Sequence, residues 1–398
     1  DKLTIFKINK YDGGLIDRRF IKRNITIIDE CHKLEEIGRW IGTLEFTQHQ
    51  FNSLNLKTES KETLKEICIK NDKDIYAIAY YIKDKYEELA RTQLAETNRI
   101  LKTSDINQTN PSMFKNMIQK RTRLMEFIDT IEHFHYLDWD TEYLLEYNHL
   151  KLSFTCIKPA PFIHAYMFSA SDKILMMSGT IGETEDLYKS LNLNKENTEI
   201  IRIPEIFNYE KSPIIVIESV NLKYANIENI NKEIRNLKEE IVEIVKTHKN
   251  QRGVIHTSSF DTIIRLKEVL KGKNYIFHTE SNKLNECLTE FYKNPEAVLI
   301  SPSIKEGLDF KDDLCRFSII TKLPWPSLQG KADRFIYMKD KRKYNNQMLK
   351  DLTQMIGRGH RTKTDFCTTY ILDKKTNFWL KRSKSHYLGQ RILSRIEN

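Results

Sequence analysis

Short apolar runs that each end in polar residues recur along the chain. They occupy residues 25–28, 174–177, 214–217, 254–255, 298–300, 319–320 and 370–372. Such runs are typical of parallel strands that are buried on both faces and end at a binding site. Between them lie amphipathic segments, the clearest of which has apolar residues at Ile230, Ile234, Leu237, Ile241 and Ile244. Alternating strands and helices predict an α/β fold with parallel sheets.

Residues 45–147 interrupt this alternation. They contain two apolar stripes at helical spacing, formed by Ile75, Ile78, Ile82 and Leu89 and by Met117, Met125, Ile128 and Ile131. Asn107, Asn110 and Pro111 predict a loop between the two stripes. We therefore expect an all-helical insertion in an α/β domain.

Composition narrows the class of protein. The 398 residues include 64 Lys and Arg against 55 Asp and Glu, a net charge of +9, and the length predicts at least two cores. No apolar run approaches the ~18 residues of a membrane span, and the first residues lack a signal-peptide core, so we expect a cytoplasmic or nuclear protein, with a viral source possible and no membrane partner. The six cysteines form no CxxC pair, which argues against a disulfide framework or a zinc ribbon. The basic charge permits a nucleic-acid partner without establishing one.

Two carboxylates and a histidine follow the first apolar run, in the sequence DECH at 29–32. A nucleoside triphosphatase needs one carboxylate for a Mg²⁺-bound water and a second to orient or deprotonate the attacking water. Asp29 suits the first role and Glu30 the second. The alternative is an ordinary helix start, because the helix dipole also favours acidic residues there.

Three further motifs follow in order along the chain. SGT at 178–180 forms a small-residue turn that admits a ligand or simply caps a helix. SIKEGLDF occupies 303–310, and QMIGRGHR occupies 354–361. Arg358 and Arg361 share a helix face, where two guanidinium groups either stabilise charge on a γ-phosphate or form a solvated basic surface.

The ordered set of motifs resembles the DinG/XPD branch of the superfamily 2 helicases. DECH resembles the Walker B (DEAH box) motif, SGT the third motif, SIKEGLDF the fifth, and QMIGRGHR the sixth, QxxGRxxR. KLPWP at 322–326 also resembles the KLPFP segment of this branch. The resemblance spans most of the chain, and the pairing of EGxDF with QxxGRxxR is specific.

The resemblance implies two RecA-like lobes that bind ATP and nucleic acid in the cleft between them. Residues 1–44 and 148–190 would form part of lobe 1, residues 45–147 an arch-like helical insertion, and residues 191–398 lobe 2. The implied activity is that of an ATP-dependent DNA helicase or translocase on single-stranded or forked DNA, with 5′ to 3′ polarity. The protein partners, and the choice between DNA and RNA as track, stay open.

The resemblance also implies a role for each motif residue. Asp29 would bind Mg²⁺ through water, and Glu30 would be the general base. The residues that would contact or sense the nucleotide are His32, Glu306, Gly307 and Asp309. The residues that would couple the nucleotide state to the surface that binds the DNA strand are His32, Ser178, Gly179 and Thr180. Gln354 would contact the attacking water or γ-phosphate, and Arg358 and Arg361 would be arginine fingers.

The expected nucleic-acid contacts each have an alternative. Thr257, Ser258 and Ser259 stand where the family's fourth motif holds backbone phosphates, but they equally suit a helix N-cap. Trp325 can stack on a base or pack between its flanking prolines.

The chain departs from the family in one important respect. No GxxxxGK[ST] phosphate-binding loop occurs in it, and only 28 residues precede Asp29. We expect a fragment without the upstream half of lobe 1, which alone hydrolyses little or no ATP. An iron-sulfur cluster is not indicated in this chain. The alternative function is a noncatalytic nucleic-acid-binding or assembly factor on a helicase scaffold.

Overall fold

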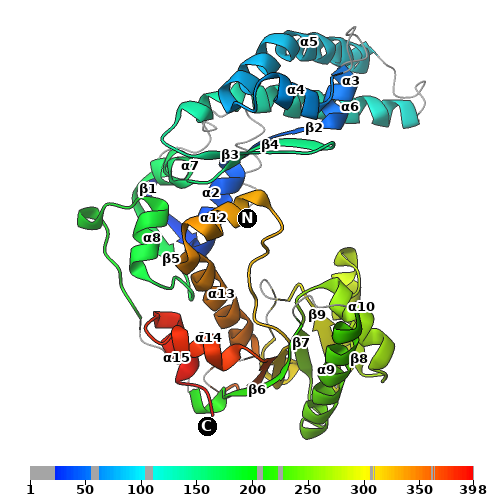
Figure 1. Cartoon of the computed structure of the whole chain (residues 1–398), viewed down its shortest axis with the longest axis vertical. Helices are drawn as coiled ribbons and strands as arrows, with labels where there is room; N and C mark the ends of the chain where they lie inside the picture. The colour runs from blue at the N-terminus through cyan, green and yellow to red at the C-terminus, as the bar shows by residue number, and fades with distance from the viewer. Residues whose placement is uncertain are drawn as a thin grey trace. The chain divides into compact units, whose positions relative to one another are not determined.

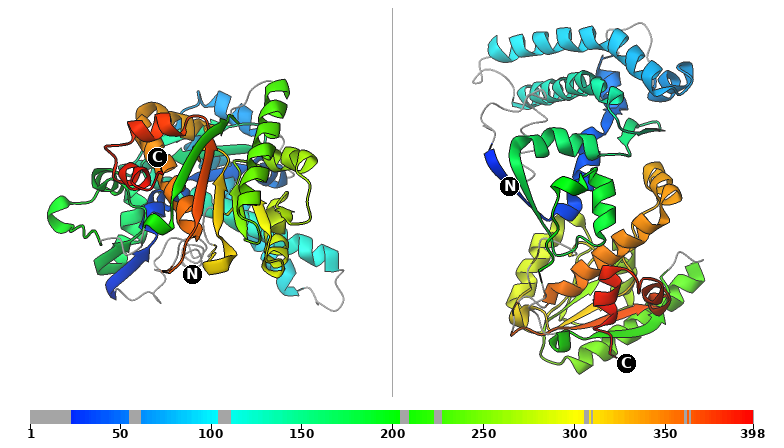
Figure 2. Two further views of the ribbon diagram at one scale, coloured as in Figure 1. Left: turned by 90° about the horizontal axis from the view of Figure 1, so that it is seen from below. Right: turned by 90° about the vertical axis from the view of Figure 1, so that its left-hand side faces the viewer.

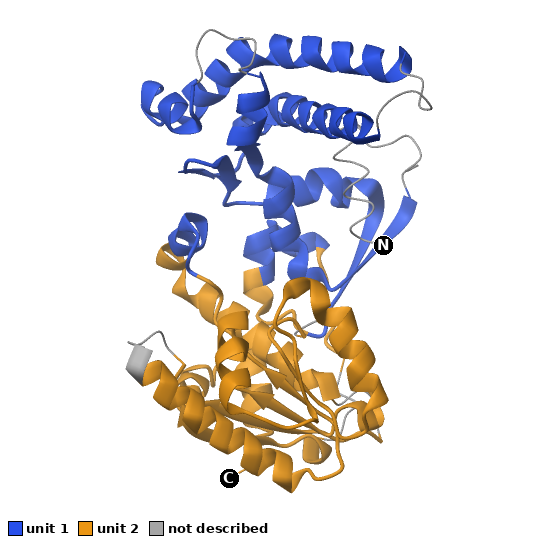
Figure 3. Cartoon of the chain, turned by 90° about the vertical axis from the view of Figure 1, so that its right-hand side faces the viewer, with its two compact units in different colours: residues 1–179, 187–197, 328–336 blue, residues 180–186, 198–327, 337–398 orange. Residues whose placement is uncertain are grey.

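The computed structural model describes residues 23–54, 62–103, 111–203, 209–222, 227–304, 308, 310–359, 362 and 364–397. The chain divides into two compact units (Figure 3). Unit 1 comprises residues 1–179, 187–197 and 328–336, and unit 2 comprises residues 180–186, 198–327 and 337–398. Helices α8 (Thr184–Leu191) and α12 (Lys331–Lys339) each contain a boundary between the units. The domain limits expected from the sequence remain a prediction.

A two-stranded parallel sheet in unit 1 carries the first candidate motifs. Strand β1 (Arg23–Asp29) pairs with β5 (Ser171–Met177) along its length, which confirms the two apolar runs predicted there. Ile28 is buried, whereas Ile25 and Ile27 are 51% and 60% exposed. Successive side chains of a strand point to opposite faces. In β5, Leu175 and Met177 are likewise 45% and 42% exposed. The expectation of burial on both faces is therefore wrong for β1 and β5 in the described part of the chain.

Two glycines let the helices beside this sheet pack closely. A 3₁₀ turn (Cys31–Lys33) leads into α2 (Leu34–Gly42), which contacts α7 (Ala160–Tyr166). A Cβ atom at Gly38 would lie 2.7 Å from the Ile163 side chain, and one at Gly42 would lie 2.3 Å from the Phe162 ring. A larger side chain at either position would force the two helices apart.

The predicted insertion begins and ends in strands. β2 (Leu44–Thr47), β3 (Tyr143–Tyr147) and β4 (Lys151–Cys156) form an antiparallel sheet in the order β2-β4-β3. Leu44 and Phe46 are buried while Glu45 is exposed, an alternation of period two that favours a strand over a helix. The all-helical description of 45–147 is therefore wrong at its two ends.

Between these strands the regular secondary structure of the described residues is helical, as predicted. The helices are α3 (Gln48–Leu54), α4 (Leu64–Lys70), α5 (Ile75–Thr103) and α6 (Pro111–Glu132). Phe46, Phe51, Tyr86 and Phe127 meet edge to face in their shared core. The expected loop lies at 104–110, outside the described residues, and Pro111 is the first residue of α6.

A carboxylate just before α4 ties that helix to α5. Glu62 accepts hydrogen bonds from the Tyr81 hydroxyl at 2.5 Å, the Lys85 ammonium at 2.7 Å and the Tyr86 hydroxyl at 3.2 Å. Burial of Glu62 tends to raise its pKa, but the hydrogen bonds from Lys85 and Tyr81 outweigh that effect and lower the pKa to about 2. The charged carboxylate therefore stabilises the insertion.

Replacing Glu62 with glutamine is expected to destabilise unit 1 by about 1–3 kcal/mol at neutral pH, because charged hydrogen bonds are lost. Since folding lowers the Glu62 pKa from 4.5 to about 2, this stabilisation is complete above pH 4.5 and declines as the pH falls toward 2. Urea unfolding of wild type and variant at several pH values measures the difference. Glu87→Gln, which breaks a more exposed pair with Arg91, should cost less than about 1 kcal/mol. An equal loss in both variants would contradict the prediction.

Unit 2 is built on a parallel sheet, part of which is labelled in Figure 1. The sheet has six strands in the order β6-β11-β10-β7-β9-β8. Its strands are β6 (Ile214–Val220), β7 (Gly253–His256), β8 (Tyr275–Phe277), β9 (Val298–Ser301), β10 (Phe317–Ile320) and β11 (Thr368–Asp373). Five of them confirm the predicted apolar runs. β8 was not predicted.

Helices cover both faces of this sheet (Figure 2). They are α9 (Ile227–Thr247), α10 (Phe260–Val269), α11 (Leu284–Lys293), α13 (Lys341–Ile356), α14 (Thr376–Arg382) and α15 (Tyr387–Leu393). Ile319 packs with α9 and α10, whereas the next residue, Ile320, packs with α13, α14 and α15. Burial on both faces explains why the strands are continuously apolar.

None of the helices in the described ranges combines the length and apolar character that crossing a membrane requires.

Candidate functional site

The first and third motifs lie side by side in unit 1. They follow strands β1 and β5, which run parallel with Asp29 opposite Met177. Residues 29–32 and 178–179 therefore leave the same edge of the sheet, although about 150 positions separate them in sequence. The carboxyl edge of a parallel sheet is where open α/β proteins bind ligands.

Glu30 and His32 form a polar contact at this edge. Glu30 has a left-handed backbone with φ 53° and ψ 42°, and its N–H donates to Asp29 Oδ1 at 2.8 Å. Such a conformation costs roughly 1–2 kcal/mol for a residue other than glycine. His32 Nδ1 lies 3.2 Å from Glu30 Oε2 and 2.8 Å from Ser178 Oγ. The imidazole is 4% exposed and the Glu30 carboxylate 46%, so the carboxylate can reach a ligand while the histidine supports it.

The Asp29 carboxylate would hold Mg²⁺ only together with water molecules and phosphate oxygens, which would supply most of the ligands. In the part of the chain that the structure describes, no group of three or more His, Cys, Asp and Glu side chains could hold a metal. Mg²⁺ in nucleotide sites commonly takes one or two carboxylates, with waters and phosphate oxygens completing its octahedron. Asp29 satisfies that smaller requirement.

The third and sixth motifs meet in unit 2. Gln354 lies in the last turn of α13, and its side-chain amide donates to the Thr180 hydroxyl at 2.9 Å. Thr180 is buried. The turn after the third motif is also held by α13 and α15, since Asp186 accepts from Asn346 and Glu183 accepts from the Tyr387 N–H at 2.6 Å. Sequence reasoning missed these contacts, because single polar residues on helices carry no pattern.

The third motif is therefore divided between the two units. Unit 1 ends at Gly179 and unit 2 begins at Thr180. The Ser178 hydroxyl contacts His32 in unit 1, and the Thr180 hydroxyl contacts Gln354 in unit 2. The third motif thus has one contact with residues 29–32 within unit 1 and one contact with the sixth motif within unit 2.

Arg358 links the sixth motif to the fifth. It lies in a 3₁₀ turn (Gly357–Gly359) after α13, is buried, and donates from Nη1 to the Leu308 carbonyl. A guanidinium in this position holds the backbone of the fifth motif. The other predicted residues of these two motifs, Glu306, Gly307, Asp309 and Arg361, lie outside the described residues.

The predicted nucleic-acid residues of the fourth motif follow β7. Ser259 is the N-cap of α10, and its hydroxyl accepts from the Thr262 N–H at 3.3 Å. Thr257 is buried, and its N–H donates to the Ser301 carbonyl at 3.2 Å. Ser258 is exposed. The N-cap interpretation thus describes Ser259, and Ser258 has the access that phosphate contact requires.

Trp325 is packed among aromatic side chains in unit 2. Its ring stacks on Tyr344 with centroids 5.2 Å apart and planes 18° apart, and it meets Trp379 edge to face at 4.7 Å. The Tyr344 hydroxyl also donates to the Pro326 carbonyl at 3.0 Å. Packing is the role of Trp325 that these contacts support.

Comparisons with known proteins find similarity to helicases. Residues 241–388 match the family model of the helicase C-terminal domain. The ATP-dependent DNA helicase CHL1 of Vanderwaltozyma polyspora is 26% identical over 157 residues, which cover 33% of this chain. The match covers 18% of that relative, less than a fifth of its length.

Several solved structures share the fold. An XPD protein in its apo form aligns over 94% of this chain and 79% of its own, with a TM-score of 0.53 and 15% identity. An XPD helicase aligns over 97% and 72%, with a TM-score of 0.54 and 14% identity. Xpd4 of S. tokodaii aligns over 94% and 78%, with a TM-score of 0.54 and 16% identity.

These similarities confirm the predicted fold class, an α/β protein with two RecA-like parallel-sheet lobes and a helical insertion in the first. With the helicase C-terminal domain in residues 241–388, they also confirm that the chain resembles the DinG/XPD-like helicases of superfamily 2.

Proposed function

We propose that this chain belongs to an ATP-dependent DNA helicase or translocase that moves on single-stranded DNA. The observation that carries the proposal is the division of the third motif, in which Ser178 contacts His32 and Thr180 contacts Gln354. A motor needs such a connection, because a change at the nucleotide must reach the surface that grips the strand. The helicase C-terminal match over residues 241–388 supports the same function.

Each group has a chemical task in this proposal. Glu30 accepts a proton from the attacking water, and His32 holds the Glu30 carboxylate through the contact at 3.2 Å. Gln354 orients that water or the γ-phosphate, while Arg358 and Arg361 stabilise charge that develops during transfer. Asp29 would hold Mg²⁺ through water, and the ion would neutralise phosphate charge. Glu306, Gly307 and Asp309 would report the nucleotide state to the strand.

The proposed track is a single strand held through its backbone, with 5′ to 3′ movement by analogy with the resembled family. Ser258 and the N–H groups at the start of α10 are the candidate phosphate contacts. Because phosphate contacts release counterions, affinity for a single-stranded oligonucleotide should fall steeply with salt. Fluorescence anisotropy between 50 and 200 mM salt measures the slope. A flat response would contradict a backbone track.

A second function is favoured by one specific feature of the sequence. The 398 residues contain no GxxxxGK[ST] loop, and such a loop supplies the N–H groups and lysine that bind the β- and γ-phosphates. A noncatalytic nucleic-acid-binding or assembly factor would keep the scaffold without this loop. We propose accordingly that the 398-residue chain by itself hydrolyses little or no ATP.

The deciding experiment compares the 398-residue chain with the full-length product of its gene. Phosphate release is measured with Mg²⁺ and ATP, with and without single-stranded DNA, beside a strand-displacement assay. The proposal expects DNA-stimulated hydrolysis by the full-length product and little by the 398-residue chain. DNA binding without hydrolysis by either protein would support the noncatalytic factor instead. Hydrolysis and movement without strand displacement would identify a translocase.

A further inference from the structure

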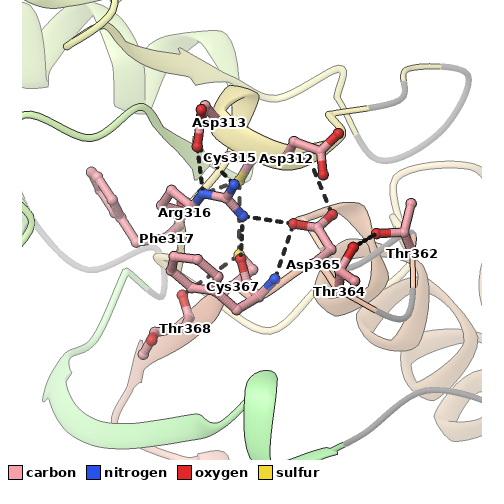
Figure 4. Close-up of polar contacts among 11 residues, drawn as sticks. Asp312, Asp313, Cys315, Arg316, Phe317, Thr362, Thr364, Asp365, Cys367 and Thr368 are labelled. Carbon is pink, nitrogen blue, oxygen red and sulfur yellow. Dashed lines mark hydrogen bonds and ion pairs between the residues drawn. The ribbon is translucent and has the colours of Figure 1, made fainter.

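One buried carboxylate joins the segment that carries the fifth motif and leads into β10 to the segment that carries the sixth motif and leads into β11 (Figure 4). Figure 4 shows the Asp365 side chain with its polar contacts to Arg316 and Asp312. This side chain is fully buried. Its Oδ1 accepts from Arg316 Nη1 at 2.7 Å and from the Phe366 N–H at 2.9 Å, and its Oδ2 accepts from the Asp312 N–H at 3.3 Å. A buried carboxylate requires such partners, because it has lost its hydration.

Arg316 completes the contact from the other segment. Its guanidinium is 11% exposed, donates to the Phe366 carbonyl at 3.2 Å, and lies over the Phe366 ring at 4.1 Å. It also donates to Asp313 Oδ1 at 2.7 Å. The Asp313 side chain is 89% exposed, so water screens this second ion pair far more than the first.

Arg316 and Asp365 lie at the ends of the two segments that carry the fifth and sixth motifs. Arg316 directly precedes β10, at the end of the segment that carries the fifth motif. Asp365 stands three residues before β11, at the end of the segment that carries the sixth motif. The pair therefore joins the two segments where both return to the sheet.

A second link joins the same two segments nearer the motifs. Arg358, at the start of the second segment, donates to the carbonyl of Leu308 in the first. Two links at different points along a pair of segments fix both their separation and their register. A single link would leave the segments able to pivot.

We propose that Asp365 and Arg316 are positioning residues for nucleotide hydrolysis, which hold the fifth and sixth motifs as one body within unit 2. The inference rests on the proposed function for its catalytic consequence. The joining of the segments is a separate physical property, which can be measured without any activity. Neither residue touches the nucleotide in this scheme; both act through the placement of Arg358.

The test uses Asp365→Asn, which keeps the size of the side chain and removes its charge. Asp313→Asn is the matched control, because it removes a carboxylate from the same guanidinium at an exposed position. Arg316→Lys is a second variant, which keeps the charge but loses the fork that binds two acceptors. Hydrogen exchange of the Asp312 and Phe366 amides is measured in the 398-residue chain, because both amides donate to Asp365.

In Asp365→Asn, both amides should exchange ~10-fold faster or more, the scale of losing a charged hydrogen bond, while central β7 and β10 stay protected. Arg316→Lys should show the same selective change, and Asp313→Asn should match wild type. In the full-length gene product, Asp365→Asn should lower kcat by ~10²-fold, the scale of a catalytic group misplaced by about 1 Å, with little change in KM for ATP.

Unchanged exchange at both amides in Asp365→Asn and Arg316→Lys would overturn the proposal. So would faster exchange throughout the sheet in both variants, because that result indicates a merely structural role. Faster exchange of the Asp312 and Phe366 amides alone, together with a wild-type kcat, would overturn the proposed role in nucleotide hydrolysis. If the full-length wild type hydrolyses no ATP, the proposed function fails, while the exchange data still decide whether Asp365 joins the segments.

Discussion

Replacing Glu30 with glutamine is expected to abolish ATP hydrolysis in the full-length gene product while ATP binding is retained. The amide keeps the size of the carboxylate but cannot accept a proton from the attacking water. The Glu30 side chain is half exposed and lies 3.2 Å from His32, so the change should not disturb a buried core. Phosphate release measures hydrolysis, and a fluorescent ATP analogue measures binding.

A matched control for this variant is Glu132→Gln in the helical insertion. Glu132 is also half exposed and pairs with a basic side chain, Arg91, but it belongs to no candidate motif. This variant should hydrolyse ATP at the wild-type rate. Hydrolysis at the wild-type rate by Glu30→Gln would remove Glu30 from the chemistry, whereas loss of both hydrolysis and binding would make it a binding residue.

Replacing Arg358 or Arg361 with alanine is expected to lower turnover by ~10³-fold or more, the scale of losing an arginine finger. For Arg358 the structure adds a second consequence, because its loss removes the donor to the Leu308 carbonyl. Arg358→Ala should therefore also loosen the fifth motif. Steady-state ATP hydrolysis measures the first effect, and hydrogen exchange around residue 308 measures the second.

The control for the arginine variants is Arg265→Ala, which removes a partly exposed guanidinium paired with Asp261 on α10. Its turnover should equal that of wild type. A large loss of turnover in Arg358→Ala with wild-type turnover in Arg361→Ala would leave Arg358 as the one arginine of the sixth motif that hydrolysis requires. Wild-type turnover in both variants would show that neither arginine of the sixth motif takes part in ATP hydrolysis.

The parallel strands could be predicted from the sequence because each contains a continuous apolar run, which in the sheet of unit 2 reflects burial on both faces. All seven predicted runs form strands, and Ile230, Ile234 and Leu237 lie on α9 as their spacing indicates. The antiparallel strands β2, β3 and β4 escaped prediction because polar residues interrupt the apolar positions of each strand. Their period of two extends over too few residues to compete with the helical stripes.

The motifs could be located from the sequence, but their contacts could not. The hydrogen bond from Gln354 to Thr180 joins residues 174 positions apart, and no local pattern encodes it. The contact of Arg358 with the Leu308 carbonyl likewise could not be predicted, and the expected role of Arg358 at a phosphate stays a prediction. Asp365 gave no signal at all, because a carboxylate before a strand is usually a surface residue.

We propose that Glu30 and the sixth-motif residues Gln354, Arg358 and Arg361 act on one nucleotide. The most direct test of this proposal is a structure of the full-length gene product with single-stranded DNA, Mg²⁺, ADP and aluminium fluoride, which mimics the transferring phosphate. The account predicts one nucleotide whose fluoride group contacts Gln354 and at least one of the two arginines, with a water between that group and Glu30. A nucleotide contacted by residues of only one unit, or none bound at these motifs, would contradict it.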